Sequence, residues 1–211
     1  MANLIVECQF AILQIQSLNI MMVGVNTSAR NSAMNTLLTA APAWQEAVFK
    51  VLKQGGVRQI AYVPDAGHSH TIRSAIADPE IEDVVLTTEE EGVALVAGAW
   101  LGGQRAVLLM QSSGVGNCIN MFSLLQAADF PFFTLVTMRG EYAEFNPWQG
   151  PMGKATQAAL ELMGIHVLRV DDPAKVEEIV SAGFDAAFQA GEKVAVLLGQ
   201  SLIGRKKWER N

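Results

Sequence analysis

The side chains best suited to chemistry in this sequence lie where predicted strands give way to predicted helices. Three such turns stand out, at residues 63–68, 87–92 and 111–117. Ligands of open parallel α/β sheets bind beyond the carboxyl ends of the strands, so these turns are the expected edge of a site. The groups that they offer are carboxylates, hydroxyls, amides, imidazoles and backbone exposed by glycine.

The second turn carries three consecutive acids, Glu89, Glu90 and Glu91. Glu90 and Glu91 fit the ordinary role of acids in a first helical turn, where their charge favours the helix dipole. Glu89 lies just past the predicted strand end, at the expected ligand edge. It is therefore the candidate catalytic carboxylate.

The third turn, Ser113-Gly114-Val115-Gly116-Asn117, stands between a predicted strand and a predicted helix. Glycine lets a ligand approach the backbone closely, and a helix N-terminus favours an anion. The third glycine of the dinucleotide-binding fingerprint is missing, since Ile119 stands in its place, and no Walker motif occurs. The pattern therefore does not predict a nucleotide site.

Metal and hydrolase chemistry find less support. His68 and His70 form an H-x-H pair, but no further Cys or His cluster accompanies them, so no metal site is predicted in this chain. Ser112 and Ser113 lack the G-x-S-x-G elbow of serine hydrolases.

The elements that position these residues alternate regularly from Pro42 onward. Strands are predicted at 57–63, 83–87, 105–111, 132–137, 166–170 and 193–198, with helices at 42–54, 70–77, 90–101, 117–128, 154–163 and 173–190. Several strands are apolar almost throughout, as strands buried on both faces are. The fold class is therefore α/β: a doubly wound, mostly parallel sheet of about six strands with helices on both faces.

The composition of the chain argues against several further classes of protein. The chain has 211 residues, is 50% hydrophobic and carries a net charge of −6, which excludes a disordered chain and argues against binding nucleic acid or an anionic membrane. No apolar run is long enough to span a membrane, and no Lys or Arg precedes Arg30 as an export signal would require. Two cysteines cannot form a disulfide framework, so a cytoplasmic location is expected.

Three segments are expected along the chain. Residues 1–40 are predicted to be an N-terminal extension or a mis-assigned start, 41–204 the α/β domain, and 205–211 a basic tail.

In this order and spacing, the turns resemble the pyrimidine-binding domain of thiamine diphosphate enzymes, above all sulfopyruvate decarboxylase alpha subunits and phosphonopyruvate decarboxylases. The matching runs are VPD at 63–65, TEEEGVALVAGA at 88–99, MQSSGVGNCIN at 110–120 and RGE at 139–141.

The resemblance implies a role for each turn. Glu89 is expected to contact the pyrimidine nitrogen of the cofactor and to favour its imino tautomer, which prepares the thiazolium carbon to attack a small 2-oxo acid. The expected cofactor-binding residues are Pro64, Asp65, Glu89, Ser113, Gly114, Gly116 and Asn117. The expected substrate-binding residues are His68, His70, Gln111 and Arg139, with Arg73 and Lys154 as further cationic candidates.

The motif that holds diphosphate and magnesium in that family, G-D-G followed by Asn-Asn, does not occur in this chain. The resemblance therefore implies a beta-type partner subunit that carries it, with like subunits around a shared site. Two other functions remain open at this point: a thiamine diphosphate-dependent carboligase of the acetolactate synthase type, and a non-catalytic α/β binding module.

Overall fold

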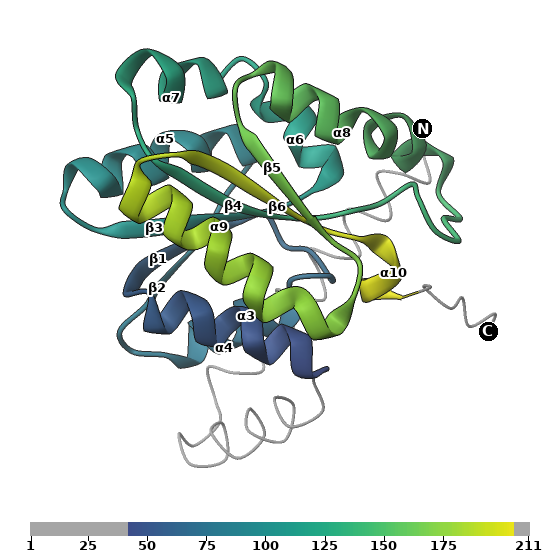
Figure 1. Ribbon diagram of the computed structural model, residues 1–211, viewed down its shortest axis with the longest axis horizontal. Helices are drawn as coiled ribbons and strands as arrows, with labels where there is room; N and C mark the ends of the chain where they lie inside the picture. The colour runs from purple at the N-terminus through teal and green to yellow at the C-terminus, as the bar shows by residue number, and fades with distance from the viewer. Residues whose placement is uncertain (1–41, 205–211) are drawn as a thin grey trace. The chain divides into compact units, whose positions relative to one another are not determined.

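The computed structural model describes residues 42–204, so the predictions for residues 1–40 and for the tail 205–211 lie outside the described part (Figure 1). Within residues 42–204, six strands form one sheet in which every neighbouring pair is parallel. The strands are β1 (Val57–Tyr62), β2 (Glu82–Val85), β3 (Arg105–Gln111), β4 (Phe132–Thr137), β5 (His166–Val170) and β6 (Lys193–Leu198). The predicted α/β fold class is confirmed.

Helices cover both faces of this sheet (Figure 1). The α-helices are α3 (Ala43–Gln54), α4 (Ser69–Ala77), α5 (Glu89–Leu101), α6 (Ser112–Cys118), α7 (Phe122–Ala128), α8 (Gly150–Leu162), α9 (Val176–Ala190) and α10 (Gln200–Ile203). Two short 3-10 helices, η1 (Pro147–Gln149) and η2 (Pro173–Lys175), precede α8 and α9. None of the helices within residues 42–204 is long and apolar enough to cross a membrane.

The core divides into two halves because strand side chains alternate between the faces of the sheet. On β3, Val107 and Leu109 pack toward α3, α4 and α9, whereas Leu108 and Met110 pack toward α5, α6, α7 and α8. All four of these side chains are fully buried. This two-sided burial explains why β3 is an almost continuous apolar run in the sequence.

The strand order is β2-β1-β3-β4-β6-β5. From β1 the chain moves outward to β2 and then returns to β3 on the opposite side of β1. The turns that follow β1 and β3 therefore diverge from two neighbouring strands, which is the topological switch point where doubly wound sheets bind ligands. Residues 63–68 and 111–117 meet at this point.

Two predictions about local structure were wrong. The glycine-containing turn at 112–117 is a helix, α6, and the helix predicted at 117–128 is shorter, because α7 begins only at Phe122. The helix predicted at 154–163 begins earlier, because α8 starts at Gly150 with Pro151 in its first turn, a position that suits proline. In addition, α10 follows β6 without having been predicted.

Candidate functional site

The Glu89 carboxylate lies at the carboxyl edge of the sheet. Glu89 is the first residue of α5, follows β2 after a short connection, and is only 9% exposed. Within the described residues its side chain accepts one hydrogen bond, to Oε2 from Asn117 Nδ2 at 2.8 Å. A carboxylate offers about four lone-pair sites on its two oxygens, so one with a single amide partner has acceptor capacity left for a ligand.

Gly114 packs directly against this carboxylate. A Cβ atom at Gly114 would lie 2.5 Å from Cγ, Cδ and Oε1 of Glu89, closer than such atoms can approach. A residue without a side chain is therefore required for Glu89 to sit against α6. The structure thus brings together three of the predicted cofactor-binding residues: Glu89, Gly114 and Asn117.

A second group of predicted residues is joined by hydrogen bonds across the switch point. Ser113 Oγ donates to Gln111 Oε1 at 3.0 Å, and Gln111 Nε2 donates to Asp65 Oδ1 at 3.1 Å. The other oxygen of Asp65, Oδ2, accepts from Thr137 Oγ1 at 2.6 Å. The chain of bonds therefore fixes Asp65 between the ends of β1, β3 and β4.

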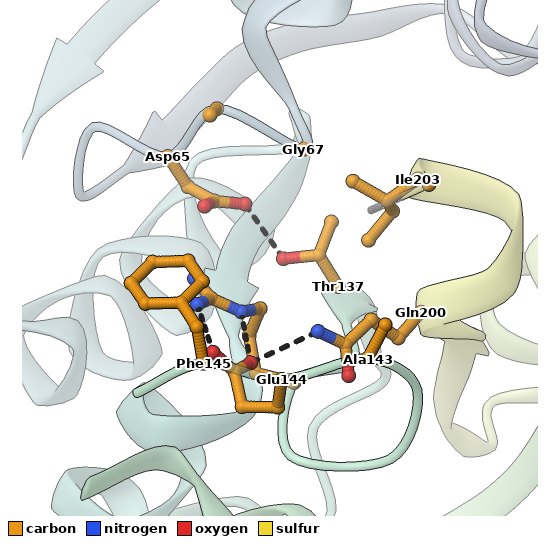
Figure 2. A pocket seen from close by; sticks show the side chains of 11 residues that line it. Asp65, Gly67, Thr137, Ala143, Glu144, Phe145, Gln200 and Ile203 are labelled. Carbon is orange, nitrogen blue, oxygen red and sulfur yellow. Dashed lines mark hydrogen bonds and ion pairs between the residues drawn. The ribbon is translucent and has the colours of Figure 1, made fainter. Parts of the chain in front are cut away.

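Asp65 also lines a pocket of about 230 Å³, which we call the edge pocket. Figure 2 shows Asp65 and Thr137 joined by a hydrogen bond on one side of it, and Glu144, Phe145 and Gln200 on another, with Gln200 hydrogen-bonded to Glu144. Three lining residues, Asp65, Thr137 and Gln200, come from the carboxyl ends of β1, β4 and β6. Glu89 is not among the lining residues, so the predicted site comprises two neighbourhoods, the Glu89 carboxylate and the edge pocket.

Arg139, a predicted substrate ligand, lines the edge pocket but is engaged by an acid. Its Nε and Nη2 donate to Glu144 at 2.7 and 2.8 Å in a bidentate pair. Glu144 also accepts from the backbone N–H groups of Gly140 and Asn146 and from Gln200 Nε2. The Arg139 guanidinium, with the other donors, lowers the pKa of Glu144 to about 2, although burial acts in the opposite direction.

The two predicted substrate histidines do not line the edge pocket. His68 is 2% exposed, and its Nε2 lies 3.2 Å from the carbonyl oxygen of Met110 and 3.1 Å from that of Leu135. Burial lowers the pKa of His68 despite the nearby Asp65, so a neutral ring donates its N–H to the ends of β3 and β4. This geometry favours a structural role for His68.

His70 lies at the base of α4, fully buried, with Nε2 2.8 Å from Glu46 Oε2. Ser74 Oγ approaches the same nitrogen at 3.4 Å. A serine hydrolase needs its serine and its acid on opposite ring nitrogens, which this arrangement does not provide. The structure therefore gives no support to a substrate or hydrolytic role for His70.

The remaining predicted residues lie outside both neighbourhoods. Gly116 packs on α8, where a Cβ would stand 3.2 Å from Met152 Sδ. Pro64 is exposed in the turn after β1, and Lys154 is exposed on α8. Arg73, on α4, has a buried Nε without a hydrogen-bond partner among the described residues.

The sequence reasoning missed three polar side chains of the edge pocket: Thr137, Glu144 and Gln200. Thr137 and Gln200 stand at or just after the ends of apolar strands, so the rule that selected Asp65 would also have found them. Glu144 lies in an aperiodic loop, and only its spacing of five residues from Arg139 hinted at the pair.

The Glu89 carboxylate has one oxygen that is open to a hydrogen-bond donor from a ligand. The Glu89 carboxylate, with Oε1 accepting no hydrogen bond within residues 42–204, rests on a glycine surface that a Cβ would fill. Next to it, burial and the charges of Glu89 and Glu90 raise the pKa of the Cys118 thiol, so that thiol is neutral. The described residues contain no group of three or more His, Cys, Asp or Glu that could hold a metal ion.

The fold and the edge site define a doubly wound α/β domain whose carboxyl edge presents an acid. A solved structure of 2-oxoglutarate:ferredoxin oxidoreductase from Magnetococcus marinus contains the same fold, with a TM-score of 0.59 over 79% of this chain and 31% of that one at 16% identity. No family model matches the sequence.

Curated relatives give the family. The sequence is 35% identical to sulfopyruvate decarboxylase subunit alpha of Methanothermobacter thermautotrophicus, over 74% of this chain and 95% of the relative. It is 32% identical to the corresponding subunit of Methanococcus maripaludis, over 72% and 92%. The chain therefore belongs to the sulfopyruvate decarboxylase alpha-subunit family, whose naming implies a partner subunit. It is also homologous to phosphonopyruvate decarboxylase of Streptomyces viridochromogenes, at 38% identity over 51% of this chain and 28% of that protein.

Proposed function

We propose that this chain is the alpha-type subunit of a thiamine diphosphate-dependent 2-oxo acid decarboxylase and that Glu89 is its activating acid. The observation that carries the proposal is the Glu89 carboxylate, 9% exposed and held by one amide donor at the carboxyl edge of the sheet. When bound, thiamine diphosphate supplies a thiazolium carbon that adds to the 2-oxo group and accepts electrons as carbon dioxide leaves. The role of Glu89 is to hold and exchange a proton with the pyrimidine nitrogen.

The substrate in this proposal is a small 2-oxo acid with a second anionic group, of the sulfopyruvate or phosphonopyruvate type. The edge pocket, of about 230 Å³, is smaller than the pockets of about 300–1,000 Å³ that hold drug-sized ligands, as suits a molecule of few atoms. Arg139 Nη1 makes no hydrogen bond within residues 42–204, so it can donate to a sulfonate or phosphonate oxygen while Glu144 holds the rest of the guanidinium. Gln111 and Ser113 are the proposed hydrogen-bonding groups beside Asp65.

The partner in this proposal is a beta-type subunit that holds the diphosphate and magnesium. Magnesium in such sites is bound by carboxylate and carbonyl oxygens together with phosphate. The three acids of the site are engaged within the chain: Glu89 by Asn117, Asp65 by Gln111 and Thr137, and Glu144 by Arg139. We also keep the prediction of a reducing, cytoplasmic location, which agrees with the unpaired buried Cys118.

The test is reconstitution. The chain is co-expressed with a neighbouring open reading frame that carries G-D-G and Asn-Asn, and the complex is assayed with 3-sulfopyruvate, thiamine diphosphate and magnesium. The expected products are equal amounts of carbon dioxide and sulfoacetaldehyde, formed only when both chains and the cofactor are present. Acyloin products would instead identify a carboligase, and turnover without thiamine diphosphate would contradict the proposal.

A further inference from the structure

The two oxygens of the Glu89 carboxylate have different surroundings. Oε2 accepts the hydrogen bond from Asn117 Nδ2 at 2.8 Å. Oε1 lies over Gly114, where an added Cβ would stand 2.5 Å away, and accepts no hydrogen bond within residues 42–204. The carboxylate therefore has one oxygen occupied by the protein and one left without a protein donor.

The chemistry of an amide decides which oxygen can carry a proton. An Asn side-chain nitrogen only donates hydrogen bonds, so the oxygen that it faces must be an acceptor. A proton on Glu89 Oε2 would make that oxygen a weaker acceptor for Asn117 Nδ2, whereas a proton on Oε1 leaves the hydrogen bond in place. The contact therefore favours proton exchange by Glu89 at Oε1.

We propose that Asn117 is a positioning residue that holds Glu89 through Oε2, so that Oε1 is the oxygen that exchanges a proton with the cofactor. This inference rests on the proposed function and deepens it. It also assigns Asn117 a different role from direct cofactor binding, which the sequence predicted.

The backbone around Asn117 suits a positioning role because α6 is packed on two sides. Gly114 brings α6 against Glu89, and Gly116 brings it against Met152 of α8. A donor on a packed helix holds its partner more accurately than a donor on a loop. The other titratable groups close to the Glu89 carboxylate are Glu90 on α5 and Cys118 on α6.

The experiment uses the complex with its beta-type partner and follows the exchange of the thiazolium C2 proton of bound thiamine diphosphate with deuterium, by NMR. We expect Asn117→Ala to slow exchange about 10- to 100-fold, the cost of a misplaced catalytic group, and to change the cofactor Kd less than about threefold. Asn120→Ala is the matched control, because Asn120 lies just beyond α6 and its side chain makes no hydrogen bond within the described residues. In Asn120→Ala the C2 proton of the bound cofactor should exchange at the wild-type rate.

Two further variants separate positioning from structural damage. In a Glu89→Gln background, adding Asn117→Ala should slow exchange no further, because Asn117 acts through Glu89. Asn117→Asp keeps the shape but sets a carboxylate against Oε2, so its exchange rate relative to wild type should recover as pH falls and the pair takes up a proton. A purely structural loss would be the same at every pH.

A crystal structure of the Asn117→Ala chain provides a readout independent of the cofactor. We expect the Glu89 carboxylate to leave the position that it occupies over Gly114. Normal exchange in Asn117→Ala, an unmoved Glu89, or losses that add to those of Glu89→Gln would each overturn the positioning role. If the wild-type complex itself shows no exchange of bound cofactor, the proposed function fails instead.

Discussion

The Glu144 carboxylate accepts hydrogen bonds from five donors, and together these hold the loop that walls the edge pocket. Two come from Arg139, and the others come from Gly140 N, Asn146 N and Gln200 Nε2, at 2.7–3.2 Å. Gln200 Oε1 in turn accepts from two further backbone N–H groups of the same loop. We therefore predict that Glu144→Gln destabilises the domain, even though the substitution preserves size and shape.

The magnitude follows from the burial of the pair. The side chains of Arg139 and Glu144 are 20% and 10% exposed, so the pair lies between a surface ion pair and a fully buried one. Exposed pairs contribute about 0–1 kcal/mol, and breaking a buried pair costs about 3–5 kcal/mol. We expect Glu144→Gln to cost about 2 kcal/mol, a fall in Tm of about 4–8 °C for a domain of this size.

The sign of the pH dependence follows from the lowered pKa of Glu144. Its folded-state pKa is about 2, below the ordinary value of 4.5. A carboxyl whose pKa is lowered by folding stabilises the fold above its unfolded-state pKa, and this stability is lost as pH falls toward the folded-state value. The stability gap between wild type and Glu144→Gln should therefore be constant above about pH 5.5 and should shrink toward pH 2.

The assay is urea unfolding at pH 7 and pH 3, monitored by circular dichroism. Glu177→Gln is the matched control, because Glu177 forms an exposed ion pair with Lys50; it should change stability by less than about 0.5 kcal/mol. The role given to the pair is refuted if Glu144→Gln is as stable to urea as this control at pH 7. It is also refuted if the difference in free energy of unfolding between Glu144→Gln and wild type is as large at pH 3 as at pH 7.

Two further predictions concern α5 and α6. Gly114→Ala should destabilise the domain by about 1–3 kcal/mol because its Cβ would overlap Glu89. Gly98→Ala, with open space at its Cβ, should instead stabilise α5 by about 0.5–1 kcal/mol. If urea unfolding shows Gly114→Ala to be the more stable of the two variants, the packing described here is contradicted. Burial raises the pKa of the Cys118 thiol, so in a Cys8→Ser chain at pH 8 this thiol should be alkylated only when the domain unfolds. Alkylation of the folded chain at the rate of a free thiol would contradict this.

Most of the fold could be predicted because a strand buried on both faces of a sheet is an almost continuous apolar run in the sequence. The apolar runs at 105–111, 132–137 and 193–198 coincide with β3, β4 and β6. The strand-end rule also placed Glu89 and Asp65 at the carboxyl edge. Both results depend on strands alone, whose period and composition can be read without knowing what packs against them.

The helix α6 could not be predicted, for a tertiary reason. Gly114 and Gly116 are poor helix formers, and within five residues they indicate a turn. The structure requires Gly114 because a Cβ there would overlap the Glu89 side chain, and Gly116 lets Met152 pack close to the helix backbone. The hydrogen-bond partners of the side chains could not be predicted from the sequence either. The pairing of Arg139 depends on how its own loop folds back to Glu144. The inward position of His68 depends on Met110 and Leu135, which lie far away in the chain.

The most direct test of the central claim is Glu89→Gln in the complex with the beta-type partner. Glutamine keeps the length and the contact with Asn117 but removes the acidic group. We predict that the variant still binds thiamine diphosphate and keeps its unfolding temperature, while exchange of the thiazolium C2 proton and release of carbon dioxide fall at least about 100-fold. Wild-type exchange in Glu89→Gln would contradict the role of this carboxylate.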